Sequence, residues 1–149
     1  MKKICTVFII SVLLVQQVEA IELPADAQES FYADAIQDLI DRDIIEGYPD
    51  GTFKPKQQLN RAEFTAILMR SQGDIPKARR RCFADVSLTE WYADIACAAK
   101  ERGIVSGERG GFFQPDRSVN YAEALKIIVE ALKFPVADQK SGEKWFDRY

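Results

Sequence analysis

The sequence predicts an all-α protein built from tandem helix–corner–helix repeats. Residues 32–67 align with residues 92–127 without a gap, and thirteen positions are identical. In each copy apolar residues recur at helical spacing, and a glycine-rich segment that ends in proline separates two helices. Such a period indicates a repeat architecture. The identical pairs are Tyr32/Tyr92, Ala33/Ala93, Asp34/Asp94, Arg42/Arg102, Ile44/Ile104, Gly47/Gly107, Gly51/Gly111, Phe53/Phe113, Pro55/Pro115, Asn60/Asn120, Ala62/Ala122, Glu63/Glu123 and Ile67/Ile127.

The first twenty residues have the pattern of a signal peptide. Two lysines precede an apolar run from Ile4 to Val15, and residues 18–20 read Val-Glu-Ala, which offers a cleavage site. The run is short for a bilayer span, so an uncleaved anchor is the less favoured alternative. We expect residues 1–20 to be removed and the mature chain to begin at Ile21, outside the cytoplasm and without a transmembrane segment.

Four further segments follow the signal peptide. The last one is expected to be the start of a third repeat, because Val136-Ala137-Asp138 repeats the pattern of residues 83–85. The chain would then stop inside that unit. The predicted segments are repeat 1 (21–72), a basic linker (73–81), repeat 2 (82–133) and a truncated repeat 3 (134–149).

Export predicts that the two cysteines of the mature chain form a disulfide. Once the signal peptide is removed, Cys82 and Cys97 remain as a pair in an oxidising compartment, where a disulfide is expected. The bridge would close a loop of about 16 residues and contribute roughly 3 kcal/mol. Two buried thiols are the alternative. With no histidine in the chain, a structural zinc site is not expected, and neither is a cofactor.

The first helix of each repeat is predicted from a cap pattern and an apolar stripe. In the second copy Ser87 and Glu90 have the spacing of a capping box, and Gly103 ends the element. In the first copy Asp26 and Glu29 hold cap positions. The stripes are Tyr32, Ile36, Leu39 and Ile40 in the first copy, and Tyr92, Ile95, Ala96 and Ala99 in the second.

An irregular corner and a second helix complete each repeat. Residues 44–55 and 104–115 form the corners, where glycine permits positive φ and proline blocks a helix. Phe53 and Phe113 are expected to anchor them. The second helices are predicted over 60–70 and 120–132. Their N-cap and N3 positions are held by Asn60 and Glu63 in the first copy, and by Asn120 and Glu123 in the second.

Capping leaves Arg61 unexplained. Nothing structural demands arginine at the first helical position, where a cation opposes the helix dipole. A guanidinium beside unpaired helix N–H groups would instead form an anion site. Replacing Arg61 with Ala should then leave stability nearly unchanged. The alternative is a solvated surface arginine. The second copy carries Tyr121, whose phenol can stack on a sugar but cannot neutralise a carboxylate.

These motifs resemble S-layer homology repeats. The first copy reads "FYADAI", "GYPDGTFKP" and "NRAEF", and the second reads "WYADIA", "GERGGFFQP" and "NYAEA". The resemblance implies three repeats around a pseudo-threefold axis. It also implies inter-repeat grooves that bind polysaccharide attached to peptidoglycan, with the arginine of "TRAE" contacting an acidic sugar substituent.

On this resemblance we assign candidate polysaccharide-binding residues and no metal ligands. The two tryptophans could instead belong to the core, and the basic run 76–81 is either a solvated linker or a binding rim for an anionic polymer. The candidates are Arg61, Tyr121, Trp91, Trp145, Asp34, Asp94, Gly47 and Gly107.

Composition and motifs favour a binding module over an enzyme or a nucleic-acid binder. The net charge of −3 does not suggest nucleic acid, and no pair of carboxylates stands apart from caps and solvated faces. We therefore expect a secreted, non-catalytic module that anchors its parent protein at the bacterial cell surface. A protein-interaction or S-layer assembly role is the alternative. Further domains of the parent protein and S-layer subunits are additional candidate partners.

Overall fold

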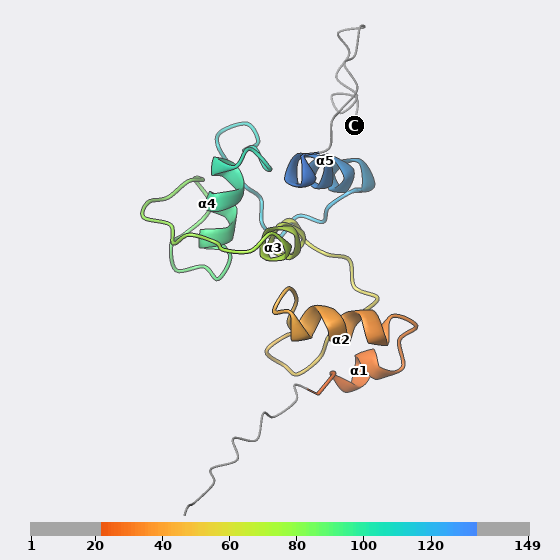
Figure 1. The fold of residues 1–149 in the computed structure, drawn as a ribbon. Coiled ribbons are helices and arrows are strands. Elements are labelled where there is room, and N and C mark those ends of the chain that lie inside the picture. The colour runs from red at the N-terminus through yellow and green to blue at the C-terminus, as the bar shows by residue number, and fades with distance from the viewer. Residues whose placement is uncertain (1–21, 134–149) are drawn as a thin grey trace, which may run out of the picture.

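The computed structural model describes residues 22–133, and helices account for all the regular structure in this part of the chain (Figure 1). The all-α prediction is therefore confirmed there. The expected signal peptide, the start of repeat 3 and Trp145 lie outside the described residues, and the pseudo-threefold arrangement stays a prediction. The helices are α1 (Ala25–Gln28), α2 (Ala33–Asp41), α3 (Arg61–Ser71), α4 (Ala93–Glu101) and α5 (Tyr121–Leu132).

Each corner is held by an aspartate from the start of its repeat. The carboxylate of Asp26 accepts hydrogen bonds from the N–H groups of Phe53, at 2.9 Å, and Lys54, at 2.7 Å. Asp85 holds the second corner in the same way, through two N–H groups at 2.7 Å. The expectation that Asp26 caps a helix is therefore wrong, because its carboxylate is used by a corner 27 residues away.

The capping box expected at Ser87 and Glu90 is also absent. α4 begins later, at Ala93, and no side chain caps its first turn. The Ser87 hydroxyl is hydrogen-bonded to the hydroxyl of Thr89, at 2.9 Å. Residues 87–93 instead form successive backbone turns before the helix, in which Glu90 N–H donates to Ser87 O and Ala93 N–H donates to Glu90 O.

The packing units are offset from the sequence repeats by one helix. α3 belongs to the first repeat by sequence, yet it packs against α4 and α5 of the second. Ala62, Ala66 and Met69 of α3 are buried in the main core together with Phe113, which is fully buried as expected. α1 and α2 form a separate small lobe (Figure 1).

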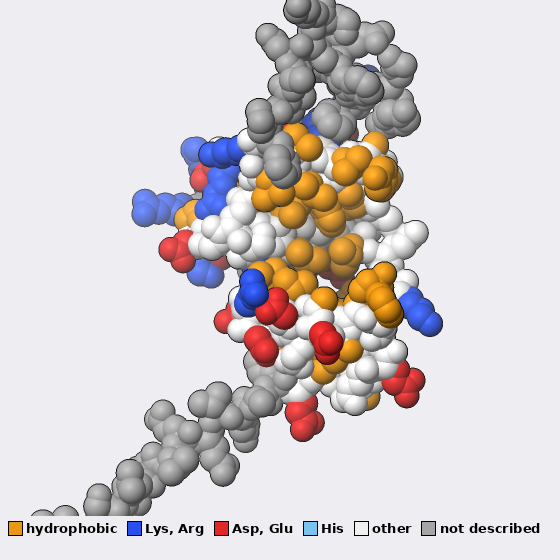
Figure 2. All heavy atoms as spheres, turned by 45° about the vertical axis from the view of Figure 1, so that its right-hand side comes forward, with side chains coloured by type: hydrophobic (Ala, Val, Ile, Leu, Met, Phe, Trp, Pro, Cys, Tyr) orange, Lys and Arg blue, Asp and Glu red, His pale blue; other side chains and the backbone are white. Residues whose placement is uncertain are grey.

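The α1–α2 lobe has its own small core. Ala27, Ile36 and Ile40 are buried there, with Phe53 packed against them as predicted. Polar contacts join the lobe to α3: Tyr48 donates to Glu63, at 2.9 Å, and Arg70 is paired with Glu46, at 2.7 Å. Figure 2 shows hydrophobic side chains gathered on the face where this lobe meets the rest of the molecule.

A disulfide fixes the start of the second repeat. Cys82 and Cys97 are bonded, with their Cα atoms 5.4 Å apart, so the predicted pairing is confirmed. The bridge ties the segment before the second corner to α4. Over residues 22–133, no helix has the length and hydropathy that a membrane crossing needs.

Candidate functional site

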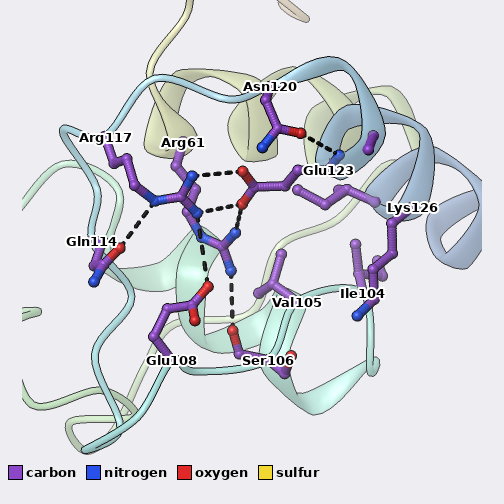
Figure 3. A pocket seen from close by; sticks show the side chains of 12 residues that line it. Arg61, Ile104, Val105, Ser106, Glu108, Gln114, Arg117, Asn120, Glu123 and Lys126 are labelled. Atoms are coloured by element: carbon purple, nitrogen blue, oxygen red, sulfur yellow. Dashed lines mark hydrogen bonds and ion pairs between the residues drawn. The ribbon is translucent and has the colours of Figure 1, made fainter. Parts of the chain in front are cut away.

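A pocket of about 340 Å³ lies where the amino-terminal end of α3 meets the second repeat (Figure 3). Arg61 of the first repeat and residues of the second repeat line it, so it lies at the contact between the two repeats, and binding of polysaccharide there stays a prediction. Charged and polar side chains line most of it, over an apolar floor from the second corner and α5. The lining residues are Arg61, Ile104, Val105, Ser106, Glu108, Gln114, Arg117, Asn120, Ala122, Glu123, Lys126 and Ile127.

The first turn of α3 is docked on the second corner through its backbone. The N–H of Arg61 donates to the carbonyl of Arg117, at 2.9 Å, and the N–H of Ala62 donates to that of Pro115, at 3.0 Å. The N–H of Glu63 donates to the Asn60 side chain. The expected anion site at free helix N–H groups is therefore wrong, because the second repeat accepts from the N–H groups of Arg61 and Ala62, and Asn60 accepts from that of Glu63.

The side chain of Arg61 is buried in the contact between repeats. Only 4% of the residue is exposed. Its guanidinium is ion-paired with Glu123 and donates to the carbonyl of Ser106, at 3.0 Å. The guanidinium carbon lies 5.3 Å from the ring centre of Phe113. The expectation that structure makes no demand on Arg61 is wrong, since this side chain joins α3 to the second repeat.

Glu123 receives a second arginine in the pocket. Arg117 donates from two nitrogens to the two oxygens of this carboxylate, at 2.7 and 2.6 Å. Figure 3 shows both guanidinium groups directed at Glu123. Arg117 also donates to the side chain of Gln114, at 2.9 Å, and lies 3.8 Å from Glu108.

Because its carboxylate binds the two arginines, Glu123 does not cap α5 as Glu63 caps α3. At α3, Asn60 and Glu63 form the complete capping box. At α5 the Asn120 side chain accepts from the N–H of Glu123, at 2.9 Å. The expectation that Glu123 reaches back to complete a second box is wrong, because Arg61 and Arg117 occupy its carboxylate.

The pocket carries a surplus of positive charge. Arg61, Arg117 and Lys126 face only two carboxylates, Glu108 and Glu123, among the lining residues. Burial, followed by the nearby charge of Arg117, lowers the pKa of Arg61 from its ordinary value. The guanidinium stays charged at neutral pH.

Among the cations that line the pocket, Lys126 and Arg61 keep donors for a ligand within the described part of the chain. Lys126 is exposed and has no hydrogen-bonding or ionic partner there, and the Arg61 Nε is buried without a hydrogen-bond partner. Because these donors are positively charged, the pocket favours a ligand with a carboxylate or another small anionic group, whose oxygens accept hydrogen bonds.

Sequence reasoning selected Arg61 but missed Arg117 and Lys126. Arg117 occupies the place of Gln57 in the first copy, and Lys126 that of Ala66. Both substitutions add a cation to the second copy near the NYAE motif, and this difference between otherwise matching repeats is a signal that could have identified them.

The aromatic candidates lie apart from the pocket lining. Tyr121 is 81% exposed and Trp91 is 56% exposed. The Trp91 ring contacts Tyr92 edge to face, with ring centres 5.3 Å apart. Trp91 is therefore not in the core, which was the alternative considered for it, and sugar contact by either aromatic side chain stays a prediction.

The remaining candidates occupy structural or exposed positions. Asp94 holds the chain segment before the second repeat, through Lys77 and the N–H of Ala78, and Asp34 is exposed on α2. A Cβ at Gly47 would lie 3.0 Å from the Thr52 carbonyl oxygen, and one at Gly107 would lie 3.3 Å from the Cα of Gly111. Close backbone approach accounts for both glycines, and their contact with sugar stays a prediction.

Comparison with known proteins finds bacterial surface-layer proteins and enzymes similar to this chain. The chain is 31% identical to the surface-layer 125 kDa protein of Lysinibacillus sphaericus over 78% of its length, 32% identical to exoglucanase XynX of Acetivibrio thermocellus over 71%, and 30% identical to S-layer protein sap of Bacillus anthracis over 75%. It covers only 10%, 10% and 13% of these relatives. The surface-layer relatives indicate a location in the cell envelope.

The family match covers most of each repeat and most of the pocket lining, but it ends before Lys126 and Ile127. The model of the S-layer homology domain matches residues 25–65 and residues 83–125. Arg61 lies in the first match, and Arg117 and Glu123 lie in the second. The chain belongs to the S-layer homology domain family, whose members anchor surface proteins to the cell wall.

Proposed function

We propose that this chain is a non-catalytic anchoring module that binds peptidoglycan-linked wall polysaccharide in the pocket between α3 and the second repeat. The observation that carries the proposal is the buried Arg61, which is shared between repeats and accompanied by two further cations at the pocket. Where relatives carry enzyme names, the matching part is 6% to 17% of their length, so their catalysis need not involve this module.

The charges of the pocket favour an acidic sugar substituent. Glu123 already accepts from Arg61 and Arg117, and it is the anion that an incoming carboxylate would have to share or displace. Lys126 is free of such competition within the described residues and is exposed at the pocket. We therefore assign Lys126 the first contact with the ligand, and Arg117 a contact that strengthens as the ligand enters.

A binding assay with wall sacculi tests this function. The purified protein should be retained by sacculi and lost when the non-peptidoglycan polymer has been stripped from them. Lys126→Gln should weaken retention roughly tenfold, the effect of losing one hydrogen bond to a charged group. Lys56→Gln is the matched control, because Lys56 is exposed, has no partner in the described structure and lies outside the pocket lining. Equal retention of both variants would contradict the assignment of the pocket.

Assembly with protein partners is the second candidate function. It is favoured by large apolar side chains that are exposed in the described structure, including Phe31, at 94%, and Leu132, at 50%. Contiguous apolar patches mark interaction surfaces, and Figure 2 shows hydrophobic side chains gathered on one face of the described molecule. Retention that survives removal of the wall polymer but is lost when proteins are extracted from the sacculi would favour this alternative.

A further inference from the structure

The segment 76–81, which we call the basic strap, is fixed against α4 by contacts at both ends. Asp94 accepts from Lys77 Nζ, at 2.7 Å, and from the N–H of Ala78, at 2.8 Å. The strap then runs directly into the disulfide between Cys82 and Cys97. A linker of mobile chain would need none of these contacts, so this part of the backbone is ordered before any partner arrives.

The strap presents three consecutive guanidinium groups without partners. The side chains of Arg79, Arg80 and Arg81 are exposed and make no hydrogen bond or ion pair within the described part of the chain. Four other arginines of the described chain differ. Those paired with a carboxylate are Arg42, Arg61, Arg70 and Arg117.

The concentration of charge is local. The whole chain carries a net charge of −3, yet its three adjacent unpaired arginines stand on one ordered segment. Lys100 lies beside them, since its ammonium donates to the carbonyl of Cys82. Figure 2 shows Lys and Arg side chains gathered along one edge of the larger lobe. The strap shares no residue with the pocket.

We propose that the basic strap is a second binding site, which takes a linear polyanion of the cell wall that carries phosphodiester or carboxylate groups along its chain. Arg79, Arg80 and Arg81 are consecutive and exposed, so their guanidinium groups offer closely spaced donors to such a polymer. Each contact also releases counterions from the polymer, which makes binding depend strongly on salt. The site acts independently of the proposed pocket.

The disulfide has a role in this site. Because Cys97 is on α4 and Cys82 directly follows the strap, the bridge keeps Arg81 on the same face of the molecule as α4. An ordered row of arginines loses less conformational freedom on binding than a mobile one, which favours affinity. Reduction of the bridge should therefore weaken polyanion binding even where the protein stays folded.

Fluorescence anisotropy with labelled linear polyphosphate, polygalacturonate and neutral dextran tests the proposal on the purified, oxidised chain. The variant R79Q/R80Q/R81Q should bind the polyanions roughly tenfold less tightly in low salt. The slope of log K against log salt concentration should fall by about two, at about 0.7 for each lost contact. R79K/R80K/R81K should retain most of that slope. Dextran should bind neither protein.

The matched control is R42Q/K54Q/K56Q, which removes the same charge from the first repeat. The change in log K for polyanion binding should be less than half of that caused by R79Q/R80Q/R81Q, since the control side chains lie on the other lobe. Equal losses from both triple variants would mean that only net charge matters and would overturn the proposal. The proposal would also be overturned if R79Q/R80Q/R81Q lost binding to anionic lipid vesicles but still bound polyphosphate and polygalacturonate as tightly as the parent. Preference between polyphosphate and polygalacturonate identifies which anion the strap takes.

Discussion

The guanidinium of Arg61 and the carboxylate of Glu123 form an ion pair across the two repeats, although 62 residues separate them in the chain. They come from the same motif in different copies: Arg61 from NRAE, and Glu123 from NYAE. The motif therefore has two structural functions. The arginine of the first copy contacts the following repeat, and the glutamate of the second copy pairs with the arginine of the preceding repeat. The same two residues line the pocket, so a change that breaks the contact between the repeats also changes the pocket.

Replacing Arg61 with Ala should destabilise the protein. Removal of one partner from a buried ion pair leaves a buried charge uncompensated, which costs roughly 3–5 kcal/mol. The low end, about 3 kcal/mol, applies here because Arg117 still faces Glu123. Arg61→Lys should recover only part of this stability, since an ammonium lacks the planar fork that reaches both Glu123 and Ser106.

Urea denaturation of Arg61→Ala, Glu123→Gln and the double variant measures the coupling. A coupling energy near zero would show that the pair does not hold the repeats together.

The large effect of Arg61→Ala on stability is the reason for testing wall binding with Lys126 instead. Replacing Lys126 with Gln should leave the unfolding midpoint unchanged.

The two helix caps should respond differently to the same truncation of their glutamates. Glu63→Ala removes half of a capping box and the acceptor for the Tyr48 hydroxyl, whereas Glu123→Ala removes the partner of two arginines. We expect a loss of about 2 kcal/mol for the first and several kcal/mol for the second. Asn60→Ala and Asn120→Ala are the matched controls and should each cost about 1 kcal/mol. Equal effects of the two glutamates in urea denaturation would contradict the observed pairing.

The sequence predicted most features that depend on neighbouring residues. The cap at Asn60, the glycine-rich corners and the burial of Phe113 follow from patterns within a few positions, and the disulfide followed from export and cysteine count. The pairing of Arg61 with Glu123 did not, because it depends on α3 packing against the next repeat rather than on α2. Asp26 was misassigned for the same reason: a carboxylate two residues into a helix looks like a cap until the corner that it holds is placed beside it.

Acid should destabilise the first repeat through its aspartates. The N–H groups of Lys54 and Phe53 lower the pKa of Asp26 below its ordinary value of 3.8. The hydrogen bonds from Thr52 lower the pKa of Asp50 to about 2. Because both pKa values are depressed in the folded protein, the stabilisation is fully present well above pH 3.8 and is lost as the pH falls from there through the folded-state values.

Thermal unfolding between pH 5 and pH 2 checks this dependence. Asp26→Asn should be less stable than the parent at pH 5, and its stability should fall less steeply toward pH 2. The matched control is Asp43→Asn, since Asp43 is exposed and lies outside the corner contacts. An acid dependence of Asp26→Asn identical to that of the parent would exclude Asp26 as a source of the effect.

Reducing the disulfide should destabilise the second repeat more than the first. Cys82 and Cys97 close a loop with a sequence separation of 15, for which the chain-entropy estimate is about 3 kcal/mol. The bridge lies beside the main core, where Phe83 follows Cys82 directly and Cys97 is buried on α4. The α1–α2 lobe has a separate core. Hydrogen exchange of a Cys82→Ser/Cys97→Ser variant should therefore show faster exchange in α4 than in α2, relative to the oxidised parent. Uniform acceleration over both lobes would instead mean that the described chain unfolds as one cooperative unit, and an unchanged rate in α4 would show that the bridge adds nothing to the core beside it.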